Sequence, residues 1–176
     1  MHKALGSATM EKAELSSEST PLPVKIRVAS NKDAEQIKEL VFSVMREFGL
    51  SPEPNGLDSD LDDIEGNYLR GGGLFEVVET PDGKIVGTAG LMIRPAGVAE
   101  LRKMYVRKDL RRRGLGKTLL EHMLAHAEKQ GIHEVELETN SCLQDAIRLY
   151  VKYGFEPIPR KPFSRRCDQV YRLKLR

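Results

Sequence analysis

Cysteine is scarce in this sequence, and the two cysteines present form no recognisable framework. Cys142 and Cys167 are the only ones among 176 residues. Their separation matches neither a metal-binding pattern nor the paired cysteines of a small disulfide-stabilised domain. We therefore expect a protein of a reducing compartment that has no metal site.

Long apolar segments are also missing. No run of residues approaches the roughly 20 apolar residues needed to cross a bilayer. The first 23 residues lack the apolar stretch of a secretory signal, and Glu11, Glu14 and Glu18 argue against a transit peptide. The sequence thus predicts a cytoplasmic protein with no membrane partner.

The chain also lacks a strong net charge. The chain has 28 lysines and arginines against 26 aspartates and glutamates, a formal charge of +2. Such a balance creates no general attraction for a polyanion, so we expect no nucleic-acid partner. The positive charge is concentrated locally instead, at Arg111, Arg112 and Arg113.

The length suits one domain with a proper core and is too short for two ordinary ones. Residues 1–23 are rich in Ser, Glu, Thr and Pro without a sustained period, which predicts a polar N-terminal tail. The single domain is expected over residues 24–176.

Hydrophobic periodicity over this domain predicts an α/β (α+β) fold with a mixed sheet. Period-two alternation predicts strands over residues 25–28, 74–80, 84–93, 98–106, 134–139 and 170–175. Helical spacing predicts three clear helices, which glycines end at Gly49, Gly131 and Gly154. Short turns between the second, third and fourth strands predict an antiparallel meander. The helix between the fourth and fifth strands predicts that these two strands pair in parallel. A weak helix between residues 50 and 73 brings the total to about four.

The stretch from Leu101 to Leu120 combines a strand, a basic turn and a helix start. Gly114 and Gly116 remove side chains where the chain enters the helix, so backbone N–H groups can converge there on an anion. This pattern predicts a phosphate site. A basic patch for RNA is the alternative, and it is disfavoured because no aromatic residue is interleaved with the arginines.

Two well-known phosphate loops do not match this stretch. The P-loop ends like Gly116-Lys117-Thr118, but its first glycine would have to stand at Arg111. The dinucleotide fingerprint fails because Leu119 occupies the place of its third glycine. The remaining pattern is Arg111-x-x-Gly114-x-Gly116 after a strand.

This pattern resembles the pyrophosphate loop of the GCN5-related N-acetyltransferases (GNAT family), which use acetyl-CoA. A second block, Ala146-x-x-x-Tyr150-x-x-x-Gly154-Phe155 after the strand ending near Asn140, is similar to another motif of that family. The resemblance covers about residues 24–176. It implies a mostly antiparallel sheet of about seven strands, in which two central parallel strands splay apart to admit the co-substrate.

The resemblance implies that an acetyl group passes directly from acetyl-CoA to a primary amine of an unidentified acceptor. It also implies which residues bind the co-substrate: Met104, Tyr105, Val106, Arg111, Arg112, Arg113, Gly114, Leu115, Gly116, Lys117, Thr118 and Asn140. A catalytically silent CoA-binding regulatory module is the alternative function. Homodimer formation is left open.

Two catalytic roles follow from the same resemblance. Glu100 begins the strand that would line the thioester and is the candidate base, with a water chain as the alternative. Tyr150 occupies the position of the family's acid and would donate its hydroxyl proton to the departing thiolate. A tyrosine in this apolar stripe could also be core filling.

Three other groups of residues could have a function: an acidic segment, a pair of histidines and a cysteine. An acidic segment is expected to be mobile and solvated, or to rim the acceptor site; its residues are Asp58, Asp60, Asp62, Asp63 and Glu65. It imitates a calcium loop but lacks the required glycine and glutamate. His122 and His126 have zinc-like spacing without a third ligand, and Cys142, with no activating histidine, is expected to be a small, partly buried residue.

Overall fold

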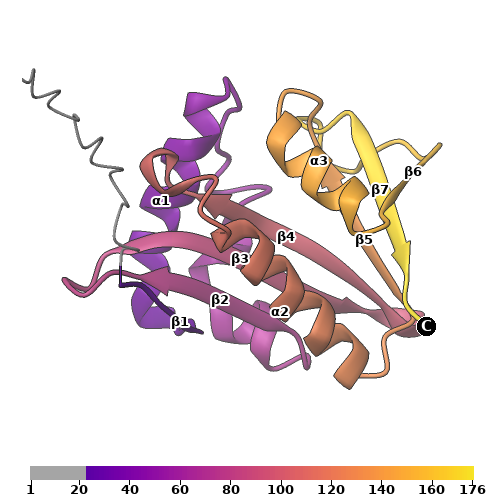
Figure 1. Ribbon diagram of the computed structural model, residues 1–176, viewed down its shortest axis with the longest axis horizontal. Helices are drawn as coiled ribbons and strands as arrows, with labels where there is room; N and C mark the ends of the chain where they lie inside the picture. The colour runs from indigo at the N-terminus through magenta and orange to yellow at the C-terminus, as the bar shows by residue number, and fades with distance from the viewer. Residues whose placement is uncertain (1–22) are drawn as a thin grey trace, which may run out of the picture.

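A computed structural model describes residues 23–176 of the chain, so the predicted tail of residues 1–23 lies, except for its last residue, outside the described part. One sheet of seven strands runs through this part, in the order β1-β2-β3-β4-β5-β7-β6 (Figure 1). The strands are β1 Lys25–Val28, β2 Leu74–Glu79, β3 Ile85–Arg94, β4 Val98–Val106, β5 Glu134–Thr139, β6 Glu156–Ile158 and β7 Gln169–Lys174.

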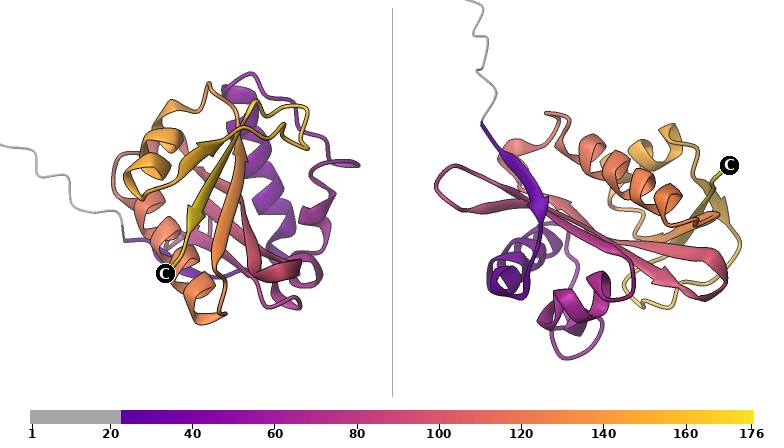
Figure 2. Two further views of the ribbon diagram at one scale, coloured as in Figure 1. Left: turned by 90° about the vertical axis from the view of Figure 1, so that its right-hand side faces the viewer. Right: turned by 90° about the horizontal axis from the view of Figure 1, so that it is seen from below.

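Helices cover both faces of this sheet. They are α1 Ala34–Glu47, α2 Leu115–Lys129 and α3 Gln144–Lys152. Helices α2 and α3 lie on one face, and α1 lies on the other (Figure 2). Each face has its own apolar core, and α1 packs in the one that contains Tyr68, Phe75 and Val77. None of the helices within residues 23–176 is both long and apolar enough to cross a membrane.

The predicted mixed, mostly antiparallel sheet is confirmed. Strands β1 to β4 form an antiparallel meander, and β4 pairs with β5 in parallel. The capping box at Ser30 and Asp33 is present at the helix start, and Gly49 and Gly154 adopt positive φ angles just beyond helix ends. Strand β6 was missed, because three residues with a central Pro157 show no alternation that a sequence pattern can detect.

Strands β4 and β5 separate soon after they pair. Their register joins Val98 to Glu134, Ala99 to Val135 and Glu100 to Glu136, whereas β4 continues to Val106 and β5 to Thr139. A bulge in β4 accompanies the separation: the register with β3 shifts between Thr88 and Gly90, and Lys103 there has a φ of 53°. Because a bulge bends its strand, it directs the second half of β4 away from β5.

A buried ion cluster connects the diverging ends. Asp58 is 1% exposed, and its carboxylate accepts hydrogen bonds from Lys103 Nζ, from both terminal nitrogens of Arg166 (2.6 and 2.8 Å) and from the backbone N–H of Glu53 (2.8 Å). Arg166 in turn accepts, at its carbonyl, a hydrogen bond from Asn140 Nδ2 at the end of β5 (2.8 Å). The cluster therefore links the bulge of β4 to the end of β5.

The expectation of a mobile, solvated acidic segment is wrong. Two short turns, η2 Ser59–Asp62 and the π-helical η3 Glu65–Leu69, bury Leu61, Ile64 and Tyr68 completely. The sequence did not reveal these apolar residues as core residues, because the many carboxylates between them obscure a helical period. Long-range ion pairs hold Asp58, Asp60 and Asp62, of which Asp62 stays exposed. Asp63 and Glu65 accept hydrogen bonds from Asn31 instead.

Replacing Asp58 by asparagine should destabilise the protein strongly. Burial would raise the pKa of Asp58, but the hydrogen bonds from Arg166, Glu53 and Lys103 outweigh burial and lower it to about 2. Loss of the carboxylate leaves Arg166 without its partner and Lys103 with only Asp60 (3.3 Å), and breaking a buried pair costs roughly 3–5 kcal/mol. Urea unfolding at neutral pH measures this free energy.

Asp109→Asn is the matched control, since Asp109 pairs with Arg107 at the exposed surface and should contribute less than about 1 kcal/mol. Because the pKa of Asp58 is lowered, its contribution is present above the ordinary value of 3.8 and is lost as the pH falls through about 2. The difference between wild type and Asp58→Asn should shrink over that interval. Equal stability losses in the two variants would contradict the structural role of the cluster.

Candidate active site

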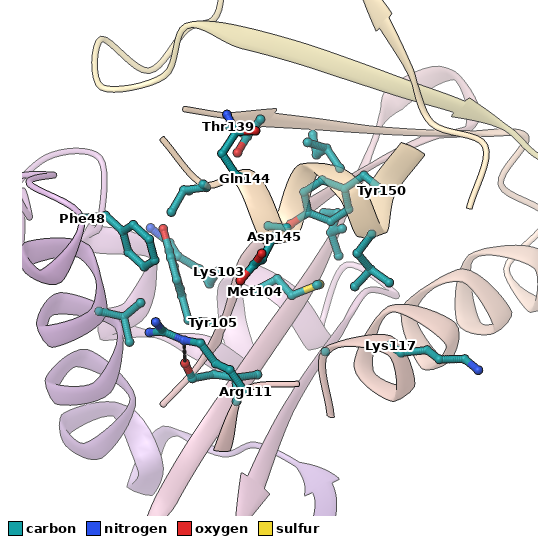
Figure 3. Close-up of a pocket in the computed structure, with 18 of the residues that line it drawn as sticks. Phe48, Lys103, Met104, Tyr105, Arg111, Lys117, Thr139, Gln144, Asp145 and Tyr150 are labelled. Atoms are coloured by element: carbon teal, nitrogen blue, oxygen red, sulfur yellow. Dashed lines mark hydrogen bonds between the residues drawn. The ribbon is translucent and has the colours of Figure 1, made fainter. Parts of the chain in front are cut away.

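The separation of β4 and β5 opens a cavity of about 520 Å³, which we call cavity A. One wall is the unpaired part of β4, and another is α3 (Figure 3). The basic loop, residues 107–114, and the start of α2 form its mouth. The cavity therefore lies at the motifs that the sequence singled out.

The mouth of cavity A presents free backbone donors. Gly114 is the N-cap of α2 with a φ of 83°, and no side chain caps the helix. The first N–H groups of a helix have no intrahelical acceptor, and they carry the positive end of the helix dipole. Gly116 lies among them without a side chain, so an anionic group can approach the backbone closely.

Arg111 has a structural role that the sequence did not reveal. Its guanidinium forms a two-pronged ion pair with Glu47 of α1 (2.6 and 2.9 Å), and its Nε donates to the carbonyl of Val106 (2.8 Å). The guanidinium also lies over the ring of Phe48, 5.2 Å from its centre. Arg111 thus lines cavity A but anchors the loop to α1, and its charge is largely committed to the protein.

The other predicted co-substrate residues divide into two groups. Arg112 and Lys117 line cavity A together with Gly114 and Gly116, although the Lys117 amine points away from the cavity interior in Figure 3. The residues that do not line it are Arg113, Leu115, Thr118 and Asn140. The Thr118 hydroxyl donates to the Gly114 carbonyl, and the Asn140 amide is engaged by Arg166 and Cys142.

Strand β4 supplies an unpaired edge to the cavity. Met104, Tyr105 and Val106 all line cavity A, and they lie beyond the last β4 residue that pairs with β5. Their backbone groups on that side can accept an extended ligand as an added strand. The bulge at Lys103, held by the Thr88 hydroxyl that donates to its carbonyl (2.7 Å), sets the direction of this edge.

Tyr150 of α3 also reaches cavity A. Its side chain is mostly buried and packs against Phe155, with ring centres 5.7 Å apart, while its hydroxyl points into the cavity (Figure 3). Burial, with a smaller effect of Tyr105, raises the pKa of Tyr150 well above its ordinary value. The hydroxyl therefore keeps its proton at neutral pH and can act as a donor. Tyr153 differs, because its hydroxyl donates to Glu121 at the surface.

A second cavity, of about 590 Å³, involves the same two strands, and we call it cavity B. Glu100 and Arg102 of β4 and Glu136 and Glu138 of β5 line it, together with the loop that contains Phe163. Glu100 is thus absent from the lining of cavity A. Its Oε2 accepts hydrogen bonds from Arg94, whereas its Oε1 makes only a longer contact of 3.5 Å to Arg102 Nε.

The two cavities meet where β4 and β5 part. Arg102, Leu137 and Glu138 line both of them. From the sequence we preferred Glu100 to Glu136 and Glu138, because a glutamate that alternates with apolar residues is usually only the solvent-facing half of a strand. Glu138 accepts backbone hydrogen bonds from Phe163 (2.7 Å) and Ser164 (2.9 Å), so it orders the loop that closes cavity B.

The histidines and Cys142 have other environments. His122 and His126 contact Glu76 and the carbonyl of Gly72, each at 2.8 Å. Within residues 23–176 no group of three potential ligands could hold a metal ion. Cys142 is exposed, so the expected partial burial is wrong, although its thiol lines cavity A. Desolvation raises the pKa of Cys142, which opposes a role as a nucleophile.

Comparison with known proteins agrees with this geometry. The family model described as "Acetyltransferase (GNAT) family" matches residues 41–155. The chain is 33% identical to the uncharacterized N-acetyltransferase YjgM of Escherichia coli over 132 residues, which is 72% of this chain and 78% of that protein. Both residue blocks of the sequence resemblance overlap the matched region.

Solved structures show the same fold. A GNAT-family acetyltransferase of Staphylococcus aureus superposes with a TM-score of 0.83 and 28% identity, covering 88% of this chain and all of the other. The PaiA N-acetyltransferase of Thermoplasma acidophilum, solved in complex with coenzyme A, has a TM-score of 0.67 and 22% identity over 87% of this chain and 99% of that one. At this identity the second likeness concerns the fold alone.

Replacing Gly116 by glutamate should abolish binding of acetyl-CoA without unfolding the protein. A Cβ atom at Gly116 would meet Leu149 at 3.7 Å and Met104 at 3.9 Å, which are ordinary contacts, so the fold accommodates a side chain. A carboxylate there would repel and displace the diphosphate. Calorimetric titration with acetyl-CoA measures the loss.

Gly71→Glu is the matched control, because Gly71 is exposed and has open space around its Cα. It should bind acetyl-CoA like the wild type. Unchanged affinity in a folded Gly116→Glu protein would refute the assignment of the loop.

Proposed function

This chain belongs to the GNAT family of acetyltransferases, and on that premise we propose that it transfers the acetyl group of acetyl-CoA directly to a primary amine. The observation that carries the proposal is the meeting of two cavities at the gap between β4 and β5. One cavity has the donors for a diphosphate and a strand edge for the pantetheine arm. The other brings charged side chains to the same gap, where an amine can reach the thioester.

Acetyl-CoA binds in cavity A as the co-substrate. The diphosphate contacts the N–H groups at the start of α2 between Gly114 and Lys117, and Arg112 adds positive charge at the mouth. The pantetheine arm pairs with the edge of β4 at residues 104–106. A backbone N–H of that edge polarises the thioester carbonyl. Membership of the GNAT family supports this placement, and a protein of the same fold has been solved with coenzyme A.

The acceptor amine enters through cavity B and attacks the carbonyl carbon of the thioester. An alkyl amine has a pKa of about 10, so it must lose a proton before or during the attack. Glu100 is the proposed base, and Oε1 is the oxygen available for the proton because Oε2 is occupied by Arg94. The proton passes to it directly or through a water molecule.

Collapse of the tetrahedral intermediate forms the amide and breaks the carbon–sulfur bond. The sulfur leaves with the electron pair of that bond as a thiolate, whose charge the hydroxyl of Tyr150 stabilises by donating a hydrogen bond. The raised pKa of Tyr150 ensures that the hydroxyl proton is present at neutral pH. The attacking nitrogen loses its second proton to the thiolate or to solvent as the amide forms. No covalent intermediate with the protein is required.

The test of the function is the release of CoA from acetyl-CoA in the presence of amines, with the acetylated product identified by mass. Product formation separates an enzyme from a CoA-binding regulatory module, which would bind acetyl-CoA in the same titration but release nothing. Polyamines, amino acids, aminoglycosides and peptides with free N-termini form the initial panel.

Glu100→Gln should lower kcat by roughly ten- to a thousandfold and leave acetyl-CoA affinity nearly unchanged, as expected for a lost proton acceptor. The loss should shrink as the pH rises toward the pKa of the amine, because less proton transfer is then needed. Steady-state kinetics across pH measure it. A loss that is constant with pH would indicate positioning and would remove Glu100 as the base.

Tyr150→Phe should retain the fold and the acetyl-CoA affinity and lose roughly ten- to a thousandfold in kcat. Tyr153→Phe is the control on the same helix, since its hydroxyl contacts Glu121 outside both cavities, and it should stay close to wild type. The two variants are compared at saturating acetyl-CoA. Full activity of Tyr150→Phe would make Tyr150 a core residue only.

A further inference from the structure

The charges of cavity B restrict the acceptor that it can hold. Three glutamates line it, and each already has a cationic partner. Glu100 pairs with Arg94, Glu136 pairs with Arg160 (2.6 Å), and Glu138 contacts Arg160 (3.7 Å) besides two backbone N–H groups. Among these carboxylates a polycation would find only Oε1 of Glu100 without a close cationic partner, so cavity B suits a polyamine poorly.

Two of the three guanidiniums that line cavity B are more accessible than its carboxylates, whereas the third, Arg102, is only 21% exposed. The side chains of Arg94 and Arg160 are 46% and 38% exposed, whereas those of the three glutamates are 24% or less. Within residues 23–176, Nη1 of Arg94 and Nε of Arg160 have no hydrogen-bond partner. These two residues come from the end of β3 and from the segment between β6 and β7, so spare donors enter the cavity from two elements.

An exposed aromatic ring accompanies these donors. Phe163 is 91% exposed, and the guanidinium of Arg160 lies 5.6 Å from the centre of its ring. Its backbone N–H donates to Glu138, so the ring is held beside the cavity by a residue that lines both cavities. Leu57 adds a further apolar side chain to the lining. A large exposed apolar side chain beside a cavity is a typical contact for an apolar group of a ligand.

We propose that the acceptor is a free amino acid with an apolar side chain, whose carboxylate is bound by Arg94 and Arg160 while its amine reaches the gap between β4 and β5. This inference rests on the proposed function for the direction of the amine. A guanidinium with spare N–H groups is the side chain best suited to a carboxylate. Phe163 and Leu57 contact the apolar side chain.

The test compares L-phenylalanine with L-phenylalaninamide, which keeps the amine and the ring but lacks the carboxylate. Both are assayed by CoA release at a pH above the pKa of either amine, so that their protonation does not differ. We expect a kcat/KM ratio of roughly ten- to a hundredfold in favour of the acid, the range of charge-assisted hydrogen bonds. Spermidine should be a poorer acceptor than the acid.

Variants assign the preference to the proposed residues. Arg94→Gln and Arg160→Gln should each reduce the ratio between acid and amide toward one, chiefly by raising KM for the acid. Arg160→Lys should restore part of it, since the charge remains without the planar fork. Arg165→Gln is the control, because Arg165 is an exposed arginine of the same segment that pairs with Glu53 and does not line cavity B.

Direct binding separates this inference from the proposed function. Calorimetry with the protein saturated with CoA compares the affinities of the acid and the amide without requiring turnover. Preferential binding of the acid with no acetyl transfer would refute the function and retain the carboxylate site. Equal use and equal binding of acid and amide, or a preference for spermidine, would overturn the inference while leaving an active acetyltransferase.

Discussion

Strands β4 and β5 part after three residue pairs, and the buried carboxylate of Asp58 holds the open end of the sheet together. Lys103 at the bulge of β4 and Arg166 near the end of β5 both bind this carboxylate. Parted strands leave backbone groups unpaired, which costs free energy unless a ligand or solvent satisfies them. The ion cluster stabilises the separation that creates both cavities, so the site depends on a contact outside it.

A second charged side chain near the gap, in the basic loop, is also paired within the protein. Arg111, at the first position of the phosphate-loop motif, is paired with Glu47 and stacked on Phe48, and it fixes the loop to α1. The backbone at Gly114 and Gly116 is then the part of the loop free for a ligand. A rigid loop with unsatisfied N–H groups needs little reorganisation when an anion binds, which is the advantage of such preorganised donors.

The fold, and the position of the glycine loop at cavity A, could be predicted largely from local sequence. Alternation and glycine stops located six of the seven strands and the three α-helices, because backbone geometry imposes these periods residue by residue. The loop at residues 111–116 followed from its glycine spacing, and the assignment of Met104 to Val106 to the co-substrate followed from the family resemblance and stays a prediction. The glycines at a helix start affect the backbone of only a few neighbouring residues, so the sequence alone is enough to locate such a loop.

Only the tertiary structure decided the partners of the charged residues. Asp58 and Arg166 are 108 residues apart, and no local pattern indicates that they meet in the core. The sequence therefore placed Asp58 in solvent, left Arg166 without a role and assigned Arg111 to phosphate. The burial and the charge partners of an ionisable side chain depend on long-range packing, whereas the secondary structure that carries it depends mainly on its neighbours in the chain.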